Sequence, residues 1–272
     1  MTQPALPIRT LAEVVSLSAE GASNYRLTLR VDGWPGFEPG QFAMISPGPQ
    51  GAVPRSDPLL PRPMAVYRER RENGAAEIEI LFKRHGRGTA LLTGCEPGDR
   101  VALVGPLGRG FALPSGRALL VAGGTGIASV YELAARLHAR TPGSARVLLG
   151  ARSAADLMGA SDFSALGVPL EIATEDGSLG TRGLVTELLE AALARDAEAH
   201  VFACGPTRMM QRCAEIAEAR GATCSASLEN PMACGFGVCL GCAAPLREGG
   251  FALVCRDGPV FDARAVAWEG LP

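Results

Sequence analysis

The sequence lacks an excess of charge, a long hydrophobic run and any concentration of histidine. Its 26 basic and 28 acidic residues leave a formal net charge of −2 at pH 7. Binding to nucleic acid or to an anionic membrane usually requires a broad basic surface, so we expect neither partner. The most apolar stretch, residues 118–130, is too short and too rich in glycine to cross a bilayer.

The three histidines, His85, His138 and His200, are isolated from one another in the sequence. No Ser–His–Asp pattern accompanies them, so no catalytic acid–base residue is predicted. The first residues also lack the basic segment and apolar core of a signal peptide, and we expect a cytoplasmic protein. At roughly 150 residues per domain, the 272 residues predict two domains with a small appendage.

Cysteine, by contrast, is abundant, and its distribution is uneven. Four of the eight cysteines fall within residues 234–255, with the spacing Cys234-x4-Cys239-x2-Cys242-x12-Cys255. In a cytosolic protein such a density more often indicates metal binding than disulfides. The order C-x4-C-x2-C…C is the ligand spacing of plant-type [2Fe–2S] clusters, so these four thiols are candidate cluster ligands.

Glycines within the same segment support this interpretation. Gly235, Gly237 and Gly241 allow the loop to fold back and to direct backbone N–H groups at the cluster sulfides. Two alternatives remain open: a structural zinc site, although zinc motifs usually pair two C-x2-C units, and a set of buried thiols. The scattered residues Cys95, Cys213 and Cys224 are interpreted as ordinary small apolar side chains.

The first region, residues 1–110, contains short segments of period-two alternation at residues 25–31, 76–82 and 99–104. Six prolines occur between positions 47 and 63, which indicates a long surface loop. Several short strands with little helix predict an all-β antiparallel barrel domain.

The second region, residues 111–222, alternates between apolar strand segments and helical segments, which predicts an α/β domain with a doubly wound parallel sheet. The expected strands are residues 117–122, 146–150, 170–174 and 200–204, and the expected helices are residues 127–140, 184–194 and 207–220. The third region, residues 223–272, is a small C-terminal [2Fe–2S] cysteine-loop region with little room for a core of its own.

Two strand ends of the α/β region have the features of a dinucleotide site. Gly123-Gly-Thr-Gly126 lies between a buried strand and a helix, as phosphate binding requires, although it is not the G-x-G-x-x-G fingerprint. Cys204-Gly-Pro206 ends a later strand on the carboxyl side, where open sheets bind ligands. Its thiol either approaches a nicotinamide or is simply buried. Glu175 and Asp176 either contact a ribose or are solvated loop charges.

Two strand ends of the barrel region suggest a flavin site. The segment Arg62-Pro-Met-Ala65 begins a strand after the proline-rich loop, and its arginine can neutralise a pyrophosphate. The segment Leu81-Phe-Lys83 leads into a glycine turn and a short helix containing Gly88 and Thr89. Two such elements in one barrel indicate flavin binding.

These motifs, in this order, resemble the ferredoxin–NADP reductase-like family. The segment Ser227-Leu-Glu-Asn-Pro-Met-Ala-Cys-Gly-Phe-Gly-Val-Cys-Leu-Gly-Cys242 narrows the resemblance to the electron-transfer subunits of NAD-dependent dihydroorotate dehydrogenases. The resemblance covers nearly the whole chain. It implies that Cys234, Cys239, Cys242 and Cys255 are the cluster ligands.

The resemblance also implies the cofactor-binding residues. For FAD these are Arg62, Pro63, Met64, Ala65, Leu81, Phe82, Lys83, Gly88 and Thr89, and for the nicotinamide nucleotide Gly124, Thr125, Gly126, Cys204 and Gly205. The family usually places serine or threonine where this chain has Ala65, so that hydroxyl contact to the flavin is missing.

The function implied by the resemblance is electron transfer. Dihydroorotate is oxidised in a partner subunit that contains FMN, and a [2Fe–2S] cluster and FAD in this chain pass the electrons to NAD⁺, in a two-plus-two heterotetramer. Met232, Phe236, Val238 and Leu240 are expected in the partner contact. The alternatives are a reductase subunit of another complex (an oxygenase, a hydrogenase or a ferredoxin–NAD(P) transhydrogenase) and a non-catalytic scaffold stabilised by zinc.

Overall fold

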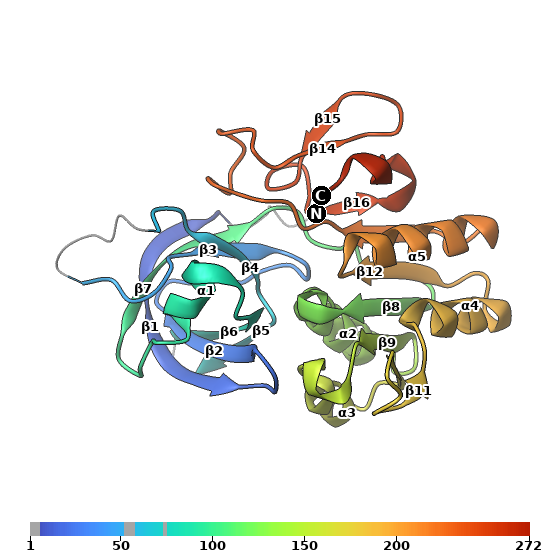
Figure 1. The fold of residues 1–272 in the computed structure, drawn as a ribbon, viewed down its shortest axis with the longest axis horizontal. Helices are drawn as coiled ribbons and strands as arrows, with labels where there is room; N and C mark the ends of the chain where they lie inside the picture. The colour runs from blue at the N-terminus through green and yellow to red at the C-terminus, as the bar shows by residue number, and fades with distance from the viewer. Residues whose placement is uncertain (1–5, 52–57, 73–74) are drawn as a thin grey trace.

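The computed structural model describes residues 6–51, 58–72 and 75–272, so part of the proline-rich loop lies outside the described residues. The chain forms a curled β-sheet, an α/β domain beside it, and a small C-terminal region that lies over both (Figure 1). Within the described residues, every helix is too short or too polar to cross a membrane.

The curled sheet is antiparallel throughout and has the strand order β4-β3-β7-β1-β2-β6-β5. Alternate residues of its strands point inward; Leu27, Leu29 and Val31, for example, are fully buried. This arrangement confirms the predicted antiparallel barrel. Its elements are β1 (Ile8–Ala19), β2 (Asn24–Val31), β3 (Phe42–Ile45), β4 (Arg62–Ala65), β5 (Arg68–Glu72), β6 (Ala75–Lys83), β7 (Arg100–Leu107) and the short helix α1 (Gly86–Leu92).

The second sheet has the order β11-β10-β9-β8-β12-β13-β16 and is parallel except for β16, which confirms the predicted doubly wound fold. Its strands are β8 (Ala118–Gly123), β9 (Ala145–Ala151), β10 (Leu170–Thr174), β11 (Thr181–Arg182), β12 (His200–Cys204), β13 (Cys224–Ser227) and β16 (Val260–Asp262). The helices are α2 (Ile127–Arg140), α3 (Ala160–Leu166), α4 (Val185–Arg195) and α5 (Thr207–Ala219).

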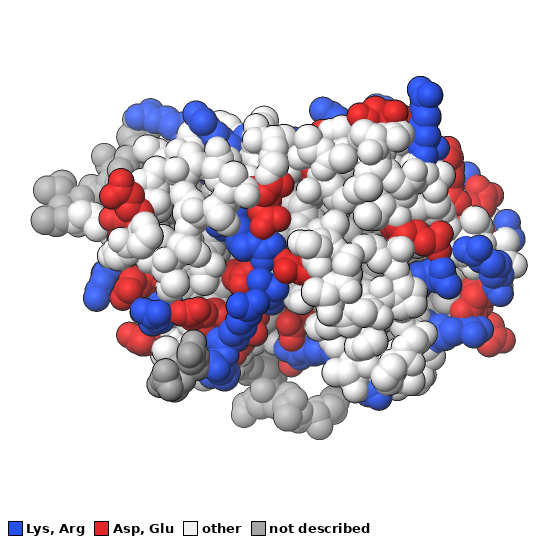
Figure 2. All heavy atoms as spheres, turned by 90° about the horizontal axis from the view of Figure 1, so that it is seen from below, with Lys and Arg blue, Asp and Glu red and all other residues white. Residues whose placement is uncertain are grey.

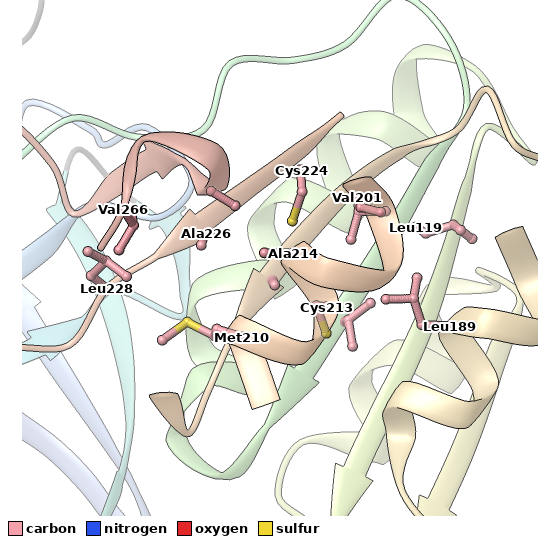
Figure 3. Packing of buried hydrophobic residues seen from close by; sticks show 14 of the residues in the cluster. Leu119, Leu189, Val201, Met210, Cys213, Ala214, Cys224, Ala226, Leu228 and Val266 are labelled. Carbon is pink, nitrogen blue, oxygen red and sulfur yellow. The ribbon is translucent and has the colours of Figure 1, made fainter. Parts of the chain in front are cut away.

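Helices cover both faces of this sheet, which explains why its strands are continuously apolar. On one face, α2 and α3 pack against a cluster that includes Leu120 and Phe202. On the other face, α4 and α5 pack against a cluster that includes Leu119 and Val201. Figure 3 shows Cys213 of α5 and Cys224 of β13 among the side chains of this second cluster, so both are core residues, as the sequence predicted.

The C-terminal region shares the core of its neighbours. It contains an antiparallel hairpin of β14 (Ala243–Pro245) and β15 (Phe251–Leu253), followed by β16, which pairs with β13 at the edge of the sheet. Its buried residues Val254, Val266 and Trp268 belong to the cluster that α4 and α5 cover. The sequence analysis predicted neither β13 nor β16, because each is only three or four residues long.

The order of the parallel strands determines where a ligand can bind. The chain runs from β8 through β9 to β10 on one side and then returns to β12 and β13 on the other, so the topological switch point lies between β8 and β12. Open α/β sheets bind ligands at the carboxyl ends of the strands at this point. The two predicted nucleotide loops, which follow β8 and β12, therefore lie side by side.

The contact between these loops predicts that any side chain at position 126 destabilises the protein. A Cβ atom there would lie 2.3 Å from the carbonyl oxygen of Cys204 and 2.5 Å from the nitrogen of Gly205. Because backbone must move, we expect Gly126→Ala to lower the free energy of unfolding by about 1–3 kcal/mol, measured by urea denaturation. Gly116→Ala is the matched control, since nothing lies near its added methyl group. Equal stability of the two variants would contradict the argument.

Candidate functional site

A cavity of about 370 Å³ lies where the barrel, the α/β domain and the C-terminal region meet. Its volume is within the usual range of small-molecule sites. The barrel contributes Gly40, Phe42, Arg62, Pro63, Met64, Ala65, Leu81, Phe82, Lys83, His85 and Thr89. The α/β domain and the segment that follows it contribute Thr125, Ser129, Ser227, Leu228, Glu229, Asn230, Met232 and Pro259.

Eight of the nine residues assigned to flavin binding from the sequence line this cavity, and the exception is Gly88. Gly88 packs against the side chain of Arg62 instead. A Cβ atom at position 88 would lie 2.4 Å from Arg62 Nε. Glycine therefore allows the guanidinium group to lie against α1. Arg62 Nη1 also donates a hydrogen bond of 2.6 Å to the carbonyl oxygen of Leu60, which helps to hold the cation at the cavity.

Strand β4 is an edge strand and pairs with β3 on one side. An edge position tolerates Pro63 and leaves a row of backbone groups facing the cavity. Thr89 also lines the cavity, but its hydroxyl accepts from the N–H of His85 (2.6 Å) and donates to the carbonyl of His85 (2.7 Å). The hydroxyl of Thr89 therefore stabilises the turn into α1, and it does so without a bound ligand.

Of the residues assigned to nicotinamide binding, Thr125 lines the cavity, while Gly126 and Gly205 form the tight contact between the two strand ends. Cys204 is fully buried, and its Sγ atom lies 3.6 Å from the carbonyl oxygen of Ser227. Burial, with a smaller contribution from the charge of Glu229, raises the pKa of the Cys204 thiol to about 12. The thiol is thus neutral, and it is enclosed beside Ser227, a residue of the cavity lining, without lining the cavity itself.

One wall of the cavity was not predicted from the sequence. Ser227 ends β13, and Leu228, Glu229 and Asn230 follow it at the carboxyl edge of the sheet. Glu229 retains a solvent-exposed surface, but the protein around its carboxyl group desolvates that group and raises its pKa. Its place directly after a strand of the parallel sheet was the signal available in the sequence, but the short β13 was not recognised.

The four predicted cluster cysteines lie together in the C-terminal region. Gly235 and Gly237 have positive φ angles of 85° and 89°, which fold the loop around the sulfur of Cys234. Burial opposes the charged form of Cys234, but the N–H groups of Cys239, Phe236 and Val238 donate hydrogen bonds to its sulfur and lower its pKa to about 6.

The thiols approach one another in two pairs. Cys242 Sγ lies 3.2 Å from Cys255 Sγ, and Cys239 hydrogen-bonds to the sulfur of Cys234. Among the residues that the structure describes, no three His, Cys, Asp or Glu side chains surround a single metal-ion position. Two pairs of thiolates fit a binuclear cluster, in which each iron takes two protein ligands.

The charge interactions of Cys242 and Cys255 are also those expected at a site that binds a cationic group. Burial, followed by the neighbouring sulfurs of Cys242 and Cys234, raises the pKa of Cys255 to about 12. Adjacent thiolates repel one another unless a cation lies between them. The pairs differ in exposure, since Cys242 and Cys255 are buried and Cys239 is exposed. A cluster held by these thiols would have one side in the protein and one side at the surface.

The cysteine loop packs directly on the barrel beside the cavity. A Cβ atom on Gly235 would lie 2.5 Å from Met44 Cγ and 3.2 Å from Leu107 Cδ1. Met232, two residues before Cys234, is half buried and lines the cavity. Phe236, Val238 and Leu240 are exposed instead, by 55%, 74% and 63%.

Two family models match the chain. The model described as "Iron-sulfur cluster binding domain of dihydroorotate dehydrogenase B" matches residues 229–267, which include all four cysteines of the two pairs. The model described as "Oxidoreductase NAD-binding domain" matches residues 120–215, which include both nucleotide loops.

Solved structures with the same fold include redox proteins. An NADH-dependent reduced ferredoxin-NADP oxidoreductase, described in a study of flavin-based electron bifurcation, aligns with a TM-score of 0.83 and 28% identity over 96% of this chain and 91% of its own. The ferredoxin reductase in carbazole 1,9a-dioxygenase aligns with a TM-score of 0.69 over 80% of this chain and 68% of its own, and its 22% identity supports the fold alone.

Curated relatives are similar over most of the sequence. The dihydroorotate dehydrogenase B (NAD(+)) electron transfer subunit of Geobacillus thermodenitrificans is 41% identical over 84% of this chain and 86% of its own length. The subunit of that name from Caldanaerobacter subterraneus is 37% identical over 94% of this chain and 97% of its own. The chain therefore belongs to the family of dihydroorotate dehydrogenase B electron transfer subunits.

Proposed function

We propose that this chain carries electrons from dihydroorotate oxidation in a partner subunit, through a [2Fe–2S] cluster and FAD, to NAD⁺ in pyrimidine biosynthesis. The observation that carries the proposal is the position of the paired thiols. Three of these thiols lie on a loop packed against Met44, and the fourth, Cys255, lies 3.2 Å from Cys242. The loop lies beside a cavity that the barrel shares with the nucleotide loops. The family of the chain supports the same role.

Each group has residues suited to hold it. Cys234 with Cys239 and Cys242 with Cys255 would hold the cluster, and β4, β6 and Arg62 would hold FAD. Flavin supplies the junction between one-electron transfer and hydride transfer. Arg62 places a cation where a pyrophosphate can be neutralised, and the apolar side chains of Phe42, Leu81 and Phe82 exclude water from the cavity walls.

The loops at the switch point would position the nicotinamide nucleotide. Gly124, Thr125 and Gly126 precede α2, whose N-terminus favours phosphate. Glu175 and Asp176 follow β10 and are exposed, and Asp176 accepts hydrogen bonds from the N–H and hydroxyl of Ser178. Their negative charge disfavours a 2′-phosphate, so we propose that NAD⁺ is the acceptor and not NADP⁺.

The partner would bind where the cluster is accessible. Cys239 is exposed, and so are the large apolar side chains of Phe236, Val238 and Leu240, which flank it in the sequence. An exposed apolar cluster of this kind favours a protein interface. We propose that its partner is the FMN-containing catalytic subunit, in a cytoplasmic heterotetramer of two plus two chains.

The similarity to the ferredoxin-NADP oxidoreductase favours a second candidate, in which the same cofactors exchange electrons with ferredoxin. Anaerobic purification followed by metal and flavin analysis is the first test, because one FAD, two irons and two sulfides per chain are expected. Addition of the FMN subunit should then give dihydroorotate-dependent NAD⁺ reduction. Reduction of ferredoxin alone would favour the second candidate. A colourless zinc protein would contradict both.

Replacement of one ligand tests the thiol pairs. Cys255→Ser should lose most of the bound iron and the visible absorbance of the cluster while it retains FAD, because Cys255 is not among the residues that line the cavity. Cys213→Ala is the matched control, since Cys213 is an equally buried cysteine in α5. Iron analysis and absorbance spectra give the result. If Cys255→Ser retains its full iron content, Cys255 is not a cluster ligand.

Replacement of one exposed side chain tests the partner surface. Phe236→Asp should weaken complex formation with the FMN subunit by about 30-fold or more, as loss of an interface hot spot does, without loss of iron. Leu184→Asp is the control, because Leu184 is 53% exposed and directly precedes α4, a helix that lies away from the β14–β15 hairpin in Figure 1. Titration by size-exclusion chromatography measures the effect. Unchanged affinity in Phe236→Asp would place the interface elsewhere.

A further inference from the structure

A mostly buried ionic cluster joins the barrel to the α/β domain behind the flavin strands. Arg26 of β2 contacts three carboxylates, Glu20 at 2.6 Å, Glu79 at 2.5 Å and Asp162 at 2.6 Å. Arg68 contacts Glu79 at 2.8 Å and Asp162 at 3.2 Å. Figure 2 shows basic and acidic side chains interleaved along the boundary between the two domains.

Asp162, in α3, is the one carboxylate of this cluster that the α/β domain contributes. Both of its oxygens are used, since Oδ2 accepts from Arg26 and from the Tyr67 hydroxyl (2.9 Å), and Oδ1 accepts from Arg68. Burial opposes its ionisation, but the hydrogen bonds from Arg26 and Tyr67 hold its pKa below the ordinary value. Asp162 is therefore a charged anchor between the domains.

The barrel side of this anchor is continuous with the flavin site. Tyr67 lies two residues after Ala65, and its N–H donates to the carbonyl oxygen of Glu79, which lies two residues before Leu81. The rings of Tyr67 and Tyr131 are 4.5 Å apart. Tyr131 belongs to α2, the helix that begins at the nucleotide loop. One set of contacts thus joins both flavin strands to the helix at the nucleotide site.

We propose that Asp162 is a positioning residue for hydride transfer, because it holds the α/β domain against the flavin strands and so sets the separation of the nicotinamide and flavin sites. This inference rests on the proposed function. Two other ion pairs among the described residues join the domains, Arg136 with Glu38 and Lys83 with Asp156. Both are more exposed, with 60% of the Glu38 side chain and 45% of the Lys83 side chain accessible, and exposed pairs hold geometry weakly.

The charge of Asp162 can be removed without leaving an unpaired charge in the cluster. Without Asp162, the two cations Arg26 and Arg68 remain paired with Glu20 and Glu79, and all four belong to the barrel. Asp162→Asn therefore leaves no uncompensated buried charge in the barrel, and FAD and iron contents should be unchanged. Tyr67→Phe removes only the hydroxyl contact and keeps the contact between the rings of residues 67 and 131.

The test is anaerobic reduction of the flavin in the holoprotein by NADH, followed by stopped-flow absorbance. Asp162→Asn should lower the limiting rate at least about tenfold, as misplacement of reacting groups does, while the apparent Kd for NADH changes less than about twofold because no nucleotide contact is removed. Tyr67→Phe should have a smaller effect in the same direction. Glu171→Gln, which removes a carboxylate paired with Arg146 inside the α/β domain, is the control.

Small-angle X-ray scattering supplies a readout that does not depend on activity. Asp162→Asn should show a larger radius of gyration than the wild-type protein, and Glu171→Gln should not. A wild-type limiting rate and unchanged scattering in Asp162→Asn would overturn the proposal. If that variant does not fold, a wild-type rate in Tyr67→Phe would overturn it. Failure of NADH to reduce the wild-type flavin would contradict the proposed function instead, and scattering would still test the anchor.

Discussion

The contact between the cysteine loop and the barrel is the constraint on which the rest of the structure depends. Electron transfer requires that a cluster lie near its flavin, and Gly235 allows this by packing on Met44 without an intervening side chain. The chain on both sides of the loop is fixed in the protein, because Leu228 before it and Val254 and Trp268 after it belong to the core under α4 and α5. The C-terminal region is thus held by burial of apolar surface against both larger domains.

The two larger domains contribute different kinds of binding group. The barrel offers the backbone of an edge strand and the cation of Arg62, whereas the sheet offers closely packed strand ends at its switch point. Neither domain encloses the cavity alone. The relative position of the domains is therefore part of the site, and the buried ionic cluster around Asp162 is more rigid than an exposed pair because its groups are desolvated and each makes several hydrogen bonds.

Several features were predictable because local sequence specifies them. The spacing of Cys234, Cys239 and Cys242 reflects how a short loop surrounds two irons, and the glycines at 123–126 reflect how a strand turns into a helix near phosphate. The apolar runs of β8 and β12 indicated a sheet covered on both faces. The alternation in β2 and β6 likewise indicated a barrel wall with one face inside.

By itself the sequence determined the fold classes of the domains, the four cysteines and most of the flavin strands, since each depends on residues close together in the chain. Tertiary structure alone decided that Glu229 and Met232 line the cavity between the domains and that Cys204 is fully buried. It also decided that Asp162 meets Arg26 across 136 positions of the chain. These contacts arise from packing between elements that are distant in the sequence. A local sequence pattern does not indicate which of these elements will pack against one another.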